Sequence, residues 1–436
     1  MFSMPESTAN PAEASTVRKN QSADKPVLVV QKYGGTSVGD VEKIKRVAKR
    51  VTAEIDEGHR VVVVVSAMGD RTDELVAMAH QINDSPPSRE MDVLLSTGEQ
   101  VSIALLAMAI QRLGYDVISL TGAQSGIHTS DVHKKARIEG IDTTRVEREL
   151  KHGRIVIVAG FQGVDETGEI TTLGRGGSDT SAVALAAALK ADRCEIYTDV
   201  DGVYNADPRV VKNAKKLDYI SYQEVLEMAS LGAGVLHPRS VELAEKYNLP
   251  LVVRSSYNTR KGTLIKNFKT GSTDPKEDIY MEKVLVRGIA LDENIAKISI
   301  LEVPDKPGIA FQLFSALAKE NIHVDMIVQN VNRTAVNDIS FTVNVDELQE
   351  AVAVSQKFSF EVGAQKVEFD QGVAKLSVVG TGIVANAEIA SKFFEALYEM
   401  GINILTISTS EIKISCLIDK ERAKDAMVHI HEKFEL

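Results

Sequence analysis

Short apolar runs rich in β-branched residues recur from Val27 to about Ile265, and stretches of helical periodicity separate most of them. The runs predict strands at Val27–Val30, Val61–Val65, Val117–Leu120, Ile155–Ala159, Glu195–Thr198 and Leu251–Arg254. Their apolar positions are continuous rather than alternating, which is typical of strands that are buried on both faces. The pattern therefore predicts an α/β domain with a mostly parallel sheet, and such sheets bind ligands at the carboxyl ends of their strands.

The pattern changes after Lys266–Asp278, a polar segment with a Gly and a Pro that predicts a linker. Beyond it, KISIL at Lys297–Leu301 is matched by KLSVV at Lys375–Val379, 78 residues later. In the same way, FSALAKENIHVDMI at Phe314–Ile327 is matched by FEALYEMGINILTI at Phe394–Ile407, 80 residues later. The repeat indicates two copies of a strand, loop, helix, strand unit.

The balance of charges excludes two classes of partner. The chain has 50 Lys and Arg against 61 Asp and Glu, which gives a formal charge of -11, and it has no strongly basic tract. Binding to nucleic acid or to anionic membranes depends on clustered Lys and Arg, so we expect neither partner. No apolar run reaches the roughly 18 residues of a membrane span.

The N-terminal segment and the cysteines indicate a cytoplasmic protein. The first 26 residues are rich in Ser, Ala, Asn and charge, lack the apolar stretch of a signal peptide, and predict a flexible tail. Cys194 and Cys416 each stand in an apolar, strand-like run without the spacing of metal ligands. They are interpreted as reduced, buried thiols.

GTGIVA at Gly380–Ala385 matches the dinucleotide-binding pattern GxGxxG/A after a strand. That pattern needs a full βαβ unit with further strands beyond it. Only 51 residues follow Ala385, and the repeat aligns this loop with VPDKPGIAF at Val303–Phe311. A loop for a regulatory ligand is therefore favoured over a dehydrogenase site.

The stretch VLVVQKYGGTSVGD ends the first predicted strand in Lys32, Tyr33 and the pair Gly34–Gly35. Glycines at a strand end let backbone N–H groups approach an anion, and Thr36 and Ser37 could cap a helix whose positive end faces the same anion. The lysine precedes the glycines, whereas in a Walker loop it follows them. The stretch is either a different kind of phosphate-binding loop or only a tight connection.

A second glycine-rich turn lies in TTLGRGGSDTSAVALAAALK, Thr171–Lys190. Ser178, Asp179 and Thr180 offer N-cap groups to an Ala/Leu-rich helix, and a well-capped helix would explain these residues alone. Capping does not account for Arg175 between glycines, where a guanidinium suits bidentate capture of a carboxylate or phosphate. The combination favours an anion site.

Three further segments complete the candidate chemistry. EIYTDVDGVYNADPR, Glu195–Arg209, ends a strand in groups suited to a nucleotide, although turn formation alone would also explain them. VVVVVSAMGDRTDEL puts Ser66 at a strand end and Thr72 six residues on. STGEQVSIALLAMAI places Glu99 at the mouth of an apolar helix, where a Glu is usually a favourable dipole charge but could also pair with an ammonium.

Together these motifs resemble the aspartate kinase family, whose members are amino-acid kinases with paired ACT regulatory domains. The motifs are KYGGTS, SAMGDRT, STGE, the GFQG at Gly160–Gly163, TLGRGGSDT, YTDVDGVYNADPR and the C-terminal repeat, and the likeness covers Val27–Leu436. It implies an α/β fold, a three-layer αβα sandwich with a mostly parallel sheet, followed by two α+β ferredoxin-like ACT domains. The expected division is a flexible tail at 1–26, a catalytic domain at 27–265, a linker at 266–285 and ACT regions at 286–365 and 366–436.

The resemblance implies transfer of the γ-phosphoryl group of ATP to the β-carboxylate of L-aspartate, which opens lysine, threonine and methionine biosynthesis. Mg²⁺ should bridge the β- and γ-phosphates and be held largely by the nucleotide, without a dedicated protein metal site. A carboxylate with a pKa of about 4 is already ionised at neutral pH, so no His or Cys is needed to activate it. The histidines are interpreted as surface residues: His128, His133, His429 and His431.

By the family pattern, Lys32 lies on the phosphates and the group in transfer, and Asp179 is the catalytic aspartate that orients Lys32. The implied ATP-binding positions are Lys32, Tyr33, Gly34, Gly35, Thr198, Asp199, Tyr204 and Arg209. The implied aspartate-binding positions are Ser66, Thr72, Glu99, Phe161, Arg175 and Ser178, with Arg175 on the α-carboxylate and Glu99 on the ammonium. In some members a lysine near the LHP motif touches ATP, but Gly234 stands in that region here, so this contact does not carry over.

ACT pairs in this family bind end-product amino acids where two such domains meet. The matching positions are Asp305, Gly308, Ile309, Ala310, Gln329, Asn330, Asn403, Ile404, Ser410 and Glu411. Lysine, threonine or both are the expected effectors, although DKPG alone would also explain a turn. ACT pairing implies a homo-oligomer, and internal methionines such as Met228 or Met281 could start a separate regulatory subunit, as in some relatives.

Two other functions are consistent with parts of the pattern. A kinase for an N-acylated substrate such as N-acetylglutamate would share the phosphate-binding motifs, but its substrate has no ammonium for Glu99 to pair with. A catalytically silent amino-acid sensor would keep the C-terminal repeat. The intact Lys32, Arg175 and Asp179 argue against that sensor.

Overall fold

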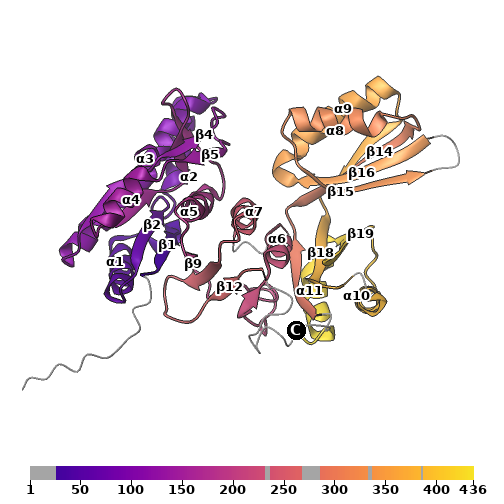
Figure 1. Ribbon diagram of the computed structural model, residues 1–436. Coiled ribbons are helices and arrows are strands. Elements are labelled where there is room, and N and C mark those ends of the chain that lie inside the picture. Colours follow the sequence, from indigo (N-terminus) through magenta and orange to yellow (C-terminus); the bar gives the residue numbers. More distant parts are fainter. Residues whose placement is uncertain (1–25, 231–235, 268–284, 332–335, 384–385) are drawn as a thin grey trace, which may run out of the picture.

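The computed structural model describes residues 26–230, 236–267, 285–331, 336–383 and 386–436 (Figure 1). An N-terminal domain and two small C-terminal sheets, each with its own helices, make up the molecule. Four sequence predictions fall wholly or mainly outside the described residues. These are the flexible tail, the linker, Gly234 and the end of GTGIVA.

The N-terminal domain is built on an eight-stranded main sheet with the order β10-β12-β11-β9-β1-β2-β6-β3. All neighbours are parallel except β11 and β12. Its strands are β1 (Leu28–Tyr33), β2 (Arg60–Val65), β3 (Val117–Leu120), β6 (Ile155–Ala159), β9 (Arg193–Thr198), β10 (Tyr219–Ile220), β11 (Leu251–Ser255) and β12 (Thr263–Ile265). All six predicted strands and the mostly parallel sheet are confirmed.

Helices cover both faces of the main sheet, which explains the continuous apolar runs. In β2, Val61, Val63 and Val65 join one core cluster with residues of α1 and α3, whereas Val62 and Val64 join another with residues of α5. Successive side chains of a strand point to opposite faces, so a strand buried on both faces is apolar at every position. The helices of this domain are α1 (Val41–Asp56), α2 (Arg71–Ile82), α3 (Ser88–Arg112), α4 (Thr144–Lys151), α5 (Gly177–Ala188), α6 (Tyr222–Ser230) and α7 (Pro238–Lys246).

A small sheet with the order β5-β4-β7-β8 adjoins the main sheet, and the sequence pattern did not predict it. Its strands are β4 (Ile127–Thr129), β5 (Ile138–Ile141), β7 (Gln162–Val164) and β8 (Ile170–Thr172). Strands of three or four residues are too short to establish a period of two. Tertiary contacts therefore decide this sheet.

The two C-terminal sheets are antiparallel and four-stranded. The first has the order β15-β16-β14-β17 and the second the order β13-β18-β20-β19. Their elements are β13 (Leu285–Asp292), β14 (Ile295–Pro304), α8 (Ile309–Lys319), β15 (Val324–Val331), β16 (Val336–Asn344), α9 (Leu348–Val362), β17 (Lys366–Asp370), β18 (Val373–Thr381), α10 (Ala387–Glu399), β19 (Thr406–Ser410), β20 (Lys413–Asp419) and α11 (Ala423–Lys433). The predicted repeat is confirmed, because β14-α8-β15 is followed by the matching β18-α10-β19.

The C-terminal sheets interleave along the chain, unlike the contiguous division expected from the sequence. Strand β13 pairs with β18 of the second sheet, with Asp292 opposite Lys375, although the division at 286–365 places it with the first. Strand β17 pairs with β14 of the first sheet, although it begins at Lys366. β13 directly precedes β14 as β17 directly precedes β18, so the two copies of the repeat exchange these strands, and only the pairing itself shows the exchange.

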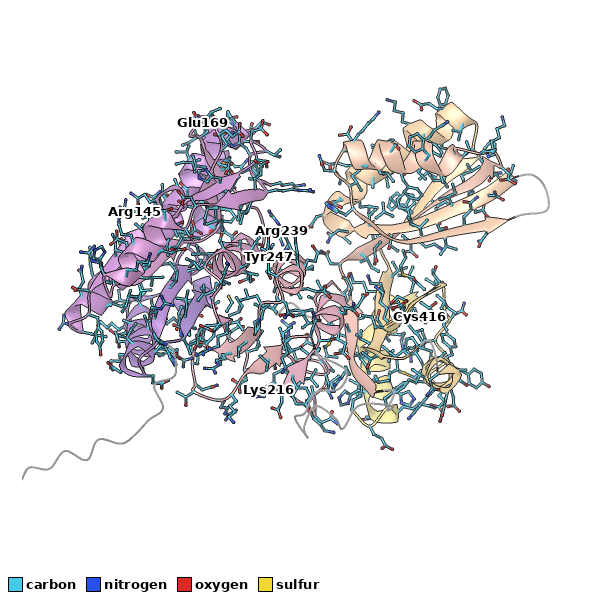
Figure 2. The ribbon with its side chains drawn as sticks, viewed as in Figure 1. Arg145, Glu169, Lys216, Arg239, Tyr247 and Cys416 are labelled. Carbon is cyan, nitrogen blue, oxygen red and sulfur yellow. The ribbon has the colours of Figure 1, made fainter. Side chains whose placement is uncertain are left out.

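Two further sequence interpretations are tested by the fold. Gly380 and Thr381 end a strand of the antiparallel second C-terminal sheet, which excludes a parallel dinucleotide-binding unit there. Cys194 and Cys416 are both free and buried, as predicted, and Figure 2 marks Cys416 in the second C-terminal sheet.

Within the described ranges, α3 is the one helix long and apolar enough to cross a membrane. Leu106 and Ile110 of this helix are fully buried, and they belong to the cluster that covers one face of the main sheet. Helix α3 also carries the buried polar residues Asp92, Ser96 and Glu99. Its apolar composition is that of a core helix.

Candidate active site

Four strands of the main sheet end at one edge of the sheet. β1 lies between β2 and β9, so the chain order reverses at β1, and ligands of open α/β sheets bind at such a reversal. Ser66 follows β2, Phe161 follows β6 and Thr198 ends β9. The fold thus brings the predicted site residues of distant motifs to one edge.

An ion pair joins the two glycine-rich motifs. Lys32 Nζ lies 2.5 Å from Asp179 Oδ1, and the two side chains are only 12% and 13% exposed. Lys32 is the fifth residue of β1 and pairs with Val64 and Ile196, so the strand continues past the predicted end at Val30. Asp179 lies in the first turn of α5, where the helix dipole favours a negative charge.

The glycine pair after β1 is held by the loop after β2. A side chain on Gly35 would come within 2.9 Å of the Ala67 carbonyl oxygen, and the Gly69 amide donates to the Gly35 carbonyl at 3.1 Å. At Gly34 a Cβ would stand 3.5 Å from Lys32 Nζ. Glycine at both positions therefore leaves backbone open beside the lysine ammonium.

Tyr33 was predicted to contact ATP, but its side chain is buried away from any ligand. Its ring stacks on Tyr197 with centroids 4.6 Å apart, and its hydroxyl donates to Gln31 Oε1 at 3.1 Å. Burial raises the pKa of Tyr33 well above its usual value. The ring of Tyr33 is therefore not available to a nucleotide, and its carbonyl accepts a hydrogen bond from the Ser66 amide at 3.1 Å.

Glu99 lies in the middle of α3, not at a helix mouth as the sequence pattern predicted. Its side chain is 3% exposed, and Oε1 accepts a hydrogen bond from the Ala67 amide at 3.1 Å. Among the described residues, Oε2 has no hydrogen-bond partner although it is buried. Burial raises the pKa of Glu99 to about 8. A buried acceptor without a partner is a candidate for a hydrogen bond from a ligand.

The turn before α5 has left-handed backbone at Gly174 and Gly176, with φ values of 77° and 69°. A Cβ on Gly176 would come within 2.2 Å of the His237 ring, so glycine is required there. Arg175 between them is exposed and forms no ion pair within the described part of the chain. Ser178 is buried beside Gly160, where a Cβ would stand 3.0 Å from Ser178 Cβ.

Phe161 combines a predicted site position with unusual backbone. Its φ of 69° is uncommon for a residue other than glycine, and such conformations persist where neighbours hold them. The Phe161 amide donates to Ser181 Oγ at 3.0 Å, and its carbonyl accepts from the Leu173 amide at 2.9 Å. Its ring faces Gly177, where a Cβ would stand 2.8 Å away. Phe161 therefore fixes the turn that carries Arg175.

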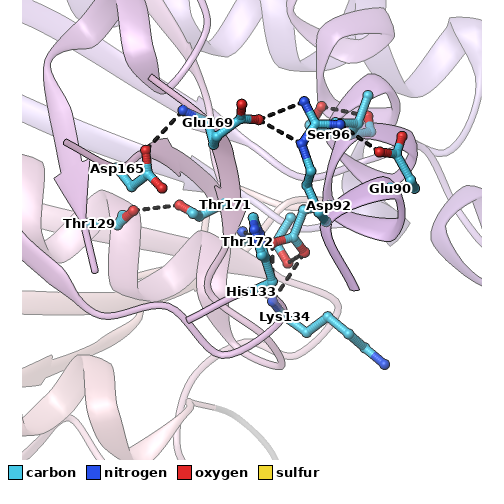
Figure 3. A network of polar contacts seen from close by, with 12 residues as sticks. Glu90, Asp92, Ser96, Thr129, His133, Lys134, Asp165, Glu169, Thr171 and Thr172 are labelled. Atoms are coloured by element: carbon cyan, nitrogen blue, oxygen red, sulfur yellow. Dashed lines mark hydrogen bonds and ion pairs between the residues drawn. The ribbon is translucent and has the colours of Figure 1, made fainter. Parts of the chain in front are cut away.

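Sequence reasoning missed a buried carboxylate under this turn. Asp92 is fully buried and accepts hydrogen bonds from Thr172 Oγ1 at 2.6 Å, the Lys134 amide at 3.1 Å and His133 Nδ1 at 2.8 Å (Figure 3). The Lys134 carbonyl in turn lies 2.9 Å from the position of a Cβ on Gly174. An Asp in a helical pattern usually indicates an exposed position, so no signal in the sequence identified it.

The interpretation of all four histidines as surface residues is partly wrong. His128 is exposed and His429 lies at the surface, where it bonds Glu399 at 2.9 Å. His133 is partly buried against Asp92, and His431 is fully buried. The pattern of single histidines in polar segments does not reveal these contacts.

His237 and Arg239 of the LHP segment also support the turn before α5. Arg239 donates to the Leu173 carbonyl at 3.1 Å and to the Ala136 carbonyl at 3.0 Å; Figure 2 marks its position. His237 packs on Gly176, and burial lowers the pKa of its ring. Its Nδ1 accepts from the Arg239 amide at 3.3 Å, which places the proton of the neutral ring on Nε2.

The β9–β10 loop, residues 199–218, lines a cavity of about 600 Å³. The predicted nucleotide residues on its wall are Thr198, Asp199, Tyr204 and Arg209. Arg209 Nη2 donates to Asp207 Oδ2 at 2.7 Å, and these hydrogen bonds hold the pKa of Asp207 below its usual value. Arg209 would have to leave Asp207 to reach a phosphate. The opposite wall is β13 and the turn after it, residues 289–294.

A second cavity, of about 210 Å³, lies in the first C-terminal sheet. Half of the predicted effector residues line it: Asp305, Gly308, Ile309, Ala310 and Gln329. Asn337 closes one side and donates to Asp305 Oδ1 at 3.0 Å. Asn330 does not line this cavity. The remaining predicted residues lie on or beside β19 of the second sheet and do not line it either: Asn403, Ile404, Ser410 and Glu411.

The chain is similar to known proteins over most of its length. Residues 27–255 match the Amino acid kinase family, and residues 301–358 and 376–434 match the ACT domain. The aspartokinase of Geobacillus stearothermophilus is 52% identical over 410 residues, which cover 94% of this chain and 97% of that protein. The crystal structure of E. coli aspartokinase III in complex with aspartate and ADP (R-state) aligns with a TM-score of 0.78 at 26% identity, over 94% of this chain and 100% of that one. Its complex with lysine and aspartate (T-state) aligns with a TM-score of 0.70 at 28% identity, over 93% and 99%.

Proposed function

The chain belongs to the amino acid kinase family, among the aspartokinases, and from this premise we propose how its own residues carry out the reaction. The reaction transfers the γ-phosphoryl group of ATP to the β-carboxylate of L-aspartate and gives 4-phospho-L-aspartate. This acyl phosphate begins the synthesis of lysine, threonine and methionine, and ACT domains place the enzyme under feedback control. No proton has to be removed from the nucleophile, so catalysis consists of positioning and charge stabilisation.

The central assignment is that Lys32 neutralises the negative charge that spreads over the phosphoryl group in transfer. Asp179 holds the ammonium by the 2.5 Å ion pair and so acts as a positioning residue. The Gly34 amide donates to the Tyr197 carbonyl at 3.3 Å, so the Gly35 amide is the N–H donor assigned to the phosphates beside this ammonium. Donors fixed in advance in a nearly dry site are worth more than the same groups in water.

Mg²⁺ enters this scheme with the nucleotide. When bound, it would neutralise negative charge on the phosphates of the nucleotide. Within the described ranges, the one group of three metal-ligating side chains is Glu54, Glu57 and His59, which lie at and just beyond the end of α1. The predicted site residues at the strand ends contribute single carboxylates, and of these Asp179 is engaged by Lys32. This donor set fits a metal carried by phosphates.

Aspartate binding is assigned to groups that match its three charges. Glu99 Oε2, a buried acceptor without a partner in the described structure, takes the ammonium. The exposed guanidinium of Arg175 takes the α-carboxylate, where a planar fork binds both oxygens. Hydroxyls and one ring complete the pocket: Ser66, Thr72, Ser178 and Phe161.

The β9–β10 loop is assigned to the adenosine and phosphates of ATP. Thr198, Asp199 and Tyr204 line the cavity of about 600 Å³, and Arg209 joins the phosphates after leaving Asp207. Tyr33 contributes no side-chain contact, because its ring is stacked in the core.

We propose lysine, threonine or both as effectors that bind in the cavity of the first C-terminal sheet. Asp305 and Gln329 offer a carboxylate and an amide to an amino acid there. Asn403, Ile404, Ser410 and Glu411 would reach this ligand only from another copy of the chain. Exposed apolar side chains on the edge strands support such pairing, with Ile327 52% and Ile407 47% exposed.

We also propose that the chain forms a homo-oligomer through its ACT domains and lies in the cytoplasm. An internal start could add a smaller regulatory subunit. A product starting at Met281 would contain every strand of both C-terminal sheets, whereas one starting at Met228 would begin inside α6. Two free, buried thiols suit the reducing cytoplasm.

The Lys32–Asp179 ion pair at the strand reversal carries this proposal, and a hydroxylamine trap tests it. ATP, Mg²⁺ and L-aspartate should give the hydroxamate of the acyl phosphate, whereas N-acetylglutamate and N-acetylaspartate should not. Equal product from the N-acylated acids would favour the alternative kinase. If the reaction with L-aspartate gives no more hydroxamate than the blank without substrate, the silent sensor would be favoured.

A further inference from the structure

The β9–β10 loop belongs structurally to the second C-terminal sheet as much as to the main sheet. Ala206 and Val211 of this loop are 3% and 1% exposed, and they are buried in the hydrophobic core of the second sheet, together with Leu376 and Phe393. Val210 and Ala214 pack against the same core. The loop proposed to bind the nucleotide therefore has these four apolar side chains in the regulatory part of the chain, whereas its Val203 is buried in the core of the main sheet.

Asn205 is the polar centre of this contact and is 4% exposed. Its carbonyl accepts from the Ile289 amide of β13 at 2.7 Å, and its amide donates to the Lys215 carbonyl at 2.9 Å. Its side-chain Oδ1 accepts from the Lys215 amide at 2.8 Å and lies 3.4 Å from His431 Nε2 of α11. Asn205 thus joins the two ends of the loop, at residues 205 and 215, and links them to β13 and α11.

A β-bulge brings β13 close enough for this contact. The register of β13 against β18 shifts between Val286 and Gly288. A Cβ on Gly288 would lie 2.6 Å from the Asn205 carbonyl oxygen, shorter than any tolerated contact, so only glycine allows the approach. Bulges re-aim a strand, and a glycine in a strand often marks the close approach of another backbone.

Two ion pairs hold the following helix, α6, to the same sheet. Lys413 Nζ of β20 lies 2.5 Å from Glu227 Oε2, and Arg287 Nε of β13 lies 3.4 Å from Glu224 Oε1. Residues 289–294 also form a wall of the cavity that Thr198 and Tyr204 line. Any displacement of β13 would move this wall and the loop together.

We propose that the second C-terminal sheet is a structural part of the nucleotide site, and that the Gly288–Asn205 contact holds the β9–β10 loop in the position that binds ATP. This inference rests on the proposed role of that loop and adds the residues that position it. Asn205, Gly288 and Val211 are positioning residues, since none of them is assigned to substrate. Coupling is reciprocal, so nucleotide binding also stabilises the Ile289–Asn205 hydrogen bond.

The test is Gly288→Ala in the full chain, with initial rates for both substrates and calorimetric titration of ADP with Mg²⁺. The added methyl group displaces the loop, so we expect KM for ATP and Kd for ADP to rise about 5-fold to 10-fold. KM for aspartate should stay within about twofold, because its proposed site lies on other elements. Gly372→Ala, in the turn before β18, is the matched control and should leave all three constants unchanged.

A variant on the loop side and a measurement on the unaltered protein keep the inference testable if Gly288→Ala does not fold. Val211→Ala removes an apolar side chain by which the β9–β10 loop is buried in the core of the second C-terminal sheet. It should also raise KM for ATP and leave KM for aspartate unchanged. In the wild-type chain, ADP with Mg²⁺ should slow hydrogen exchange of the Ile289 amide at least about threefold.

The outcomes separate this inference from the proposed function. Wild-type protein that fails to bind ADP would overturn the nucleotide assignment itself. If wild type binds ADP but the variants keep its KM for ATP, the role of the Gly288–Asn205 contact in positioning the loop would be overturned. Unchanged hydrogen exchange of the Ile289 amide on ADP binding would overturn that role as well. Equal increases in both KM values would mean general damage to the fold and would also overturn it.

Discussion

Lys32 Nζ and Asp179 Oδ1 lie 2.5 Å apart, although one residue is on β1 and the other opens α5. Both side chains are nearly buried, so the pair is shielded from the water and salt that weaken surface ion pairs. The arrangement fixes the ammonium at the end of the strand, beside Gly34. The following predictions start from this pair and from the groups around it.

Replacing Lys32 should slow the chemical step more than it weakens substrate binding. In Lys32→Met, kcat should fall about 100-fold to 1,000-fold, the usual effect of removing one donor that acts on the transition state. The hydroxamate assay measures this, and Lys45→Met, an exposed lysine on α1, is the control. A kcat within about threefold of wild type would remove Lys32 from catalysis.

Glu99→Gln should impair aspartate binding and spare ATP. The substitution keeps an acceptor for the Ala67 amide but removes the carboxyl group that would ionise against the substrate ammonium, so KM for aspartate should rise about 10-fold to 100-fold. KM for ATP should change less than about twofold. Glu90→Gln, exposed on the same helix, is the control. Parallel increases in both KM values would contradict the assigned role.

The same variant should be more stable than wild type, by a margin that grows with pH. Burial raises the pKa of Glu99 to about 8 in the folded protein, above its usual value of 4.5. The folded state therefore holds a proton that the unfolded state releases between these values, and the free energy of unfolding falls as pH rises through this window. Glu99→Gln does not titrate, so its Tm should exceed that of wild type more at pH 8 than at pH 5. A constant difference in Tm would refute this.

The Asp92 network should contribute strongly to stability. Asp92 is fully buried and accepts bonds from Thr172, Lys134 and His133, so Asp92→Ala would leave several buried donors without a partner (Figure 3). We expect a loss of about 3 kcal/mol in the free energy of unfolding, measured by urea denaturation. Asp131→Ala, exposed in the neighbouring loop, should cost less than about 0.5 kcal/mol. A similar cost for both would show that the network does not stabilise the fold.

Gln329→Ala should reduce feedback inhibition without reducing activity. Gln329 lines the cavity of the first C-terminal sheet, so the concentration of lysine or threonine that halves the rate should rise about tenfold, the effect of one or two lost hydrogen bonds. Activity without effector should stay near that of wild type, and Gln312→Ala, exposed on α8, is the control. Unchanged inhibition by both amino acids would place the effector site elsewhere.

The main sheet and the repeat could be predicted from the sequence because their signals are local. The run of five valines in β2 indicates burial on both faces, and the valines do alternate between two core clusters. The glycines beside Arg175 indicate a turn by residue type alone, since few other residues adopt their left-handed backbone. At Gly35 glycine is needed for the close approach of the Ala67 carbonyl, not for an unusual φ. Local propensity was sufficient wherever an element's own residues decide it.

Other positions could not be found in this way. Glu99 was expected at the mouth of a helix because the polar STGE precedes an apolar run, but α3 begins 11 residues earlier and encloses it. Tyr33 stands within a phosphate-binding pattern, yet its ring is stacked on Tyr197. Burial of a polar or aromatic group depends on which distant element covers it, and the chain pattern does not contain that information.

The sequence by itself determined the strands of the main sheet, the order of the two repeats and the residue types that reach the strand ends. The family resemblance of the sequence also implied that Asp179 orients Lys32, and the two side chains do form an ion pair. Tertiary structure alone decided that β13 pairs with β18 and that Gly288 approaches Asn205. The physical reason is the range of the forces involved. Periodicity and turn preference act within a few residues, whereas these contacts join segments that come together only when the whole topology forms.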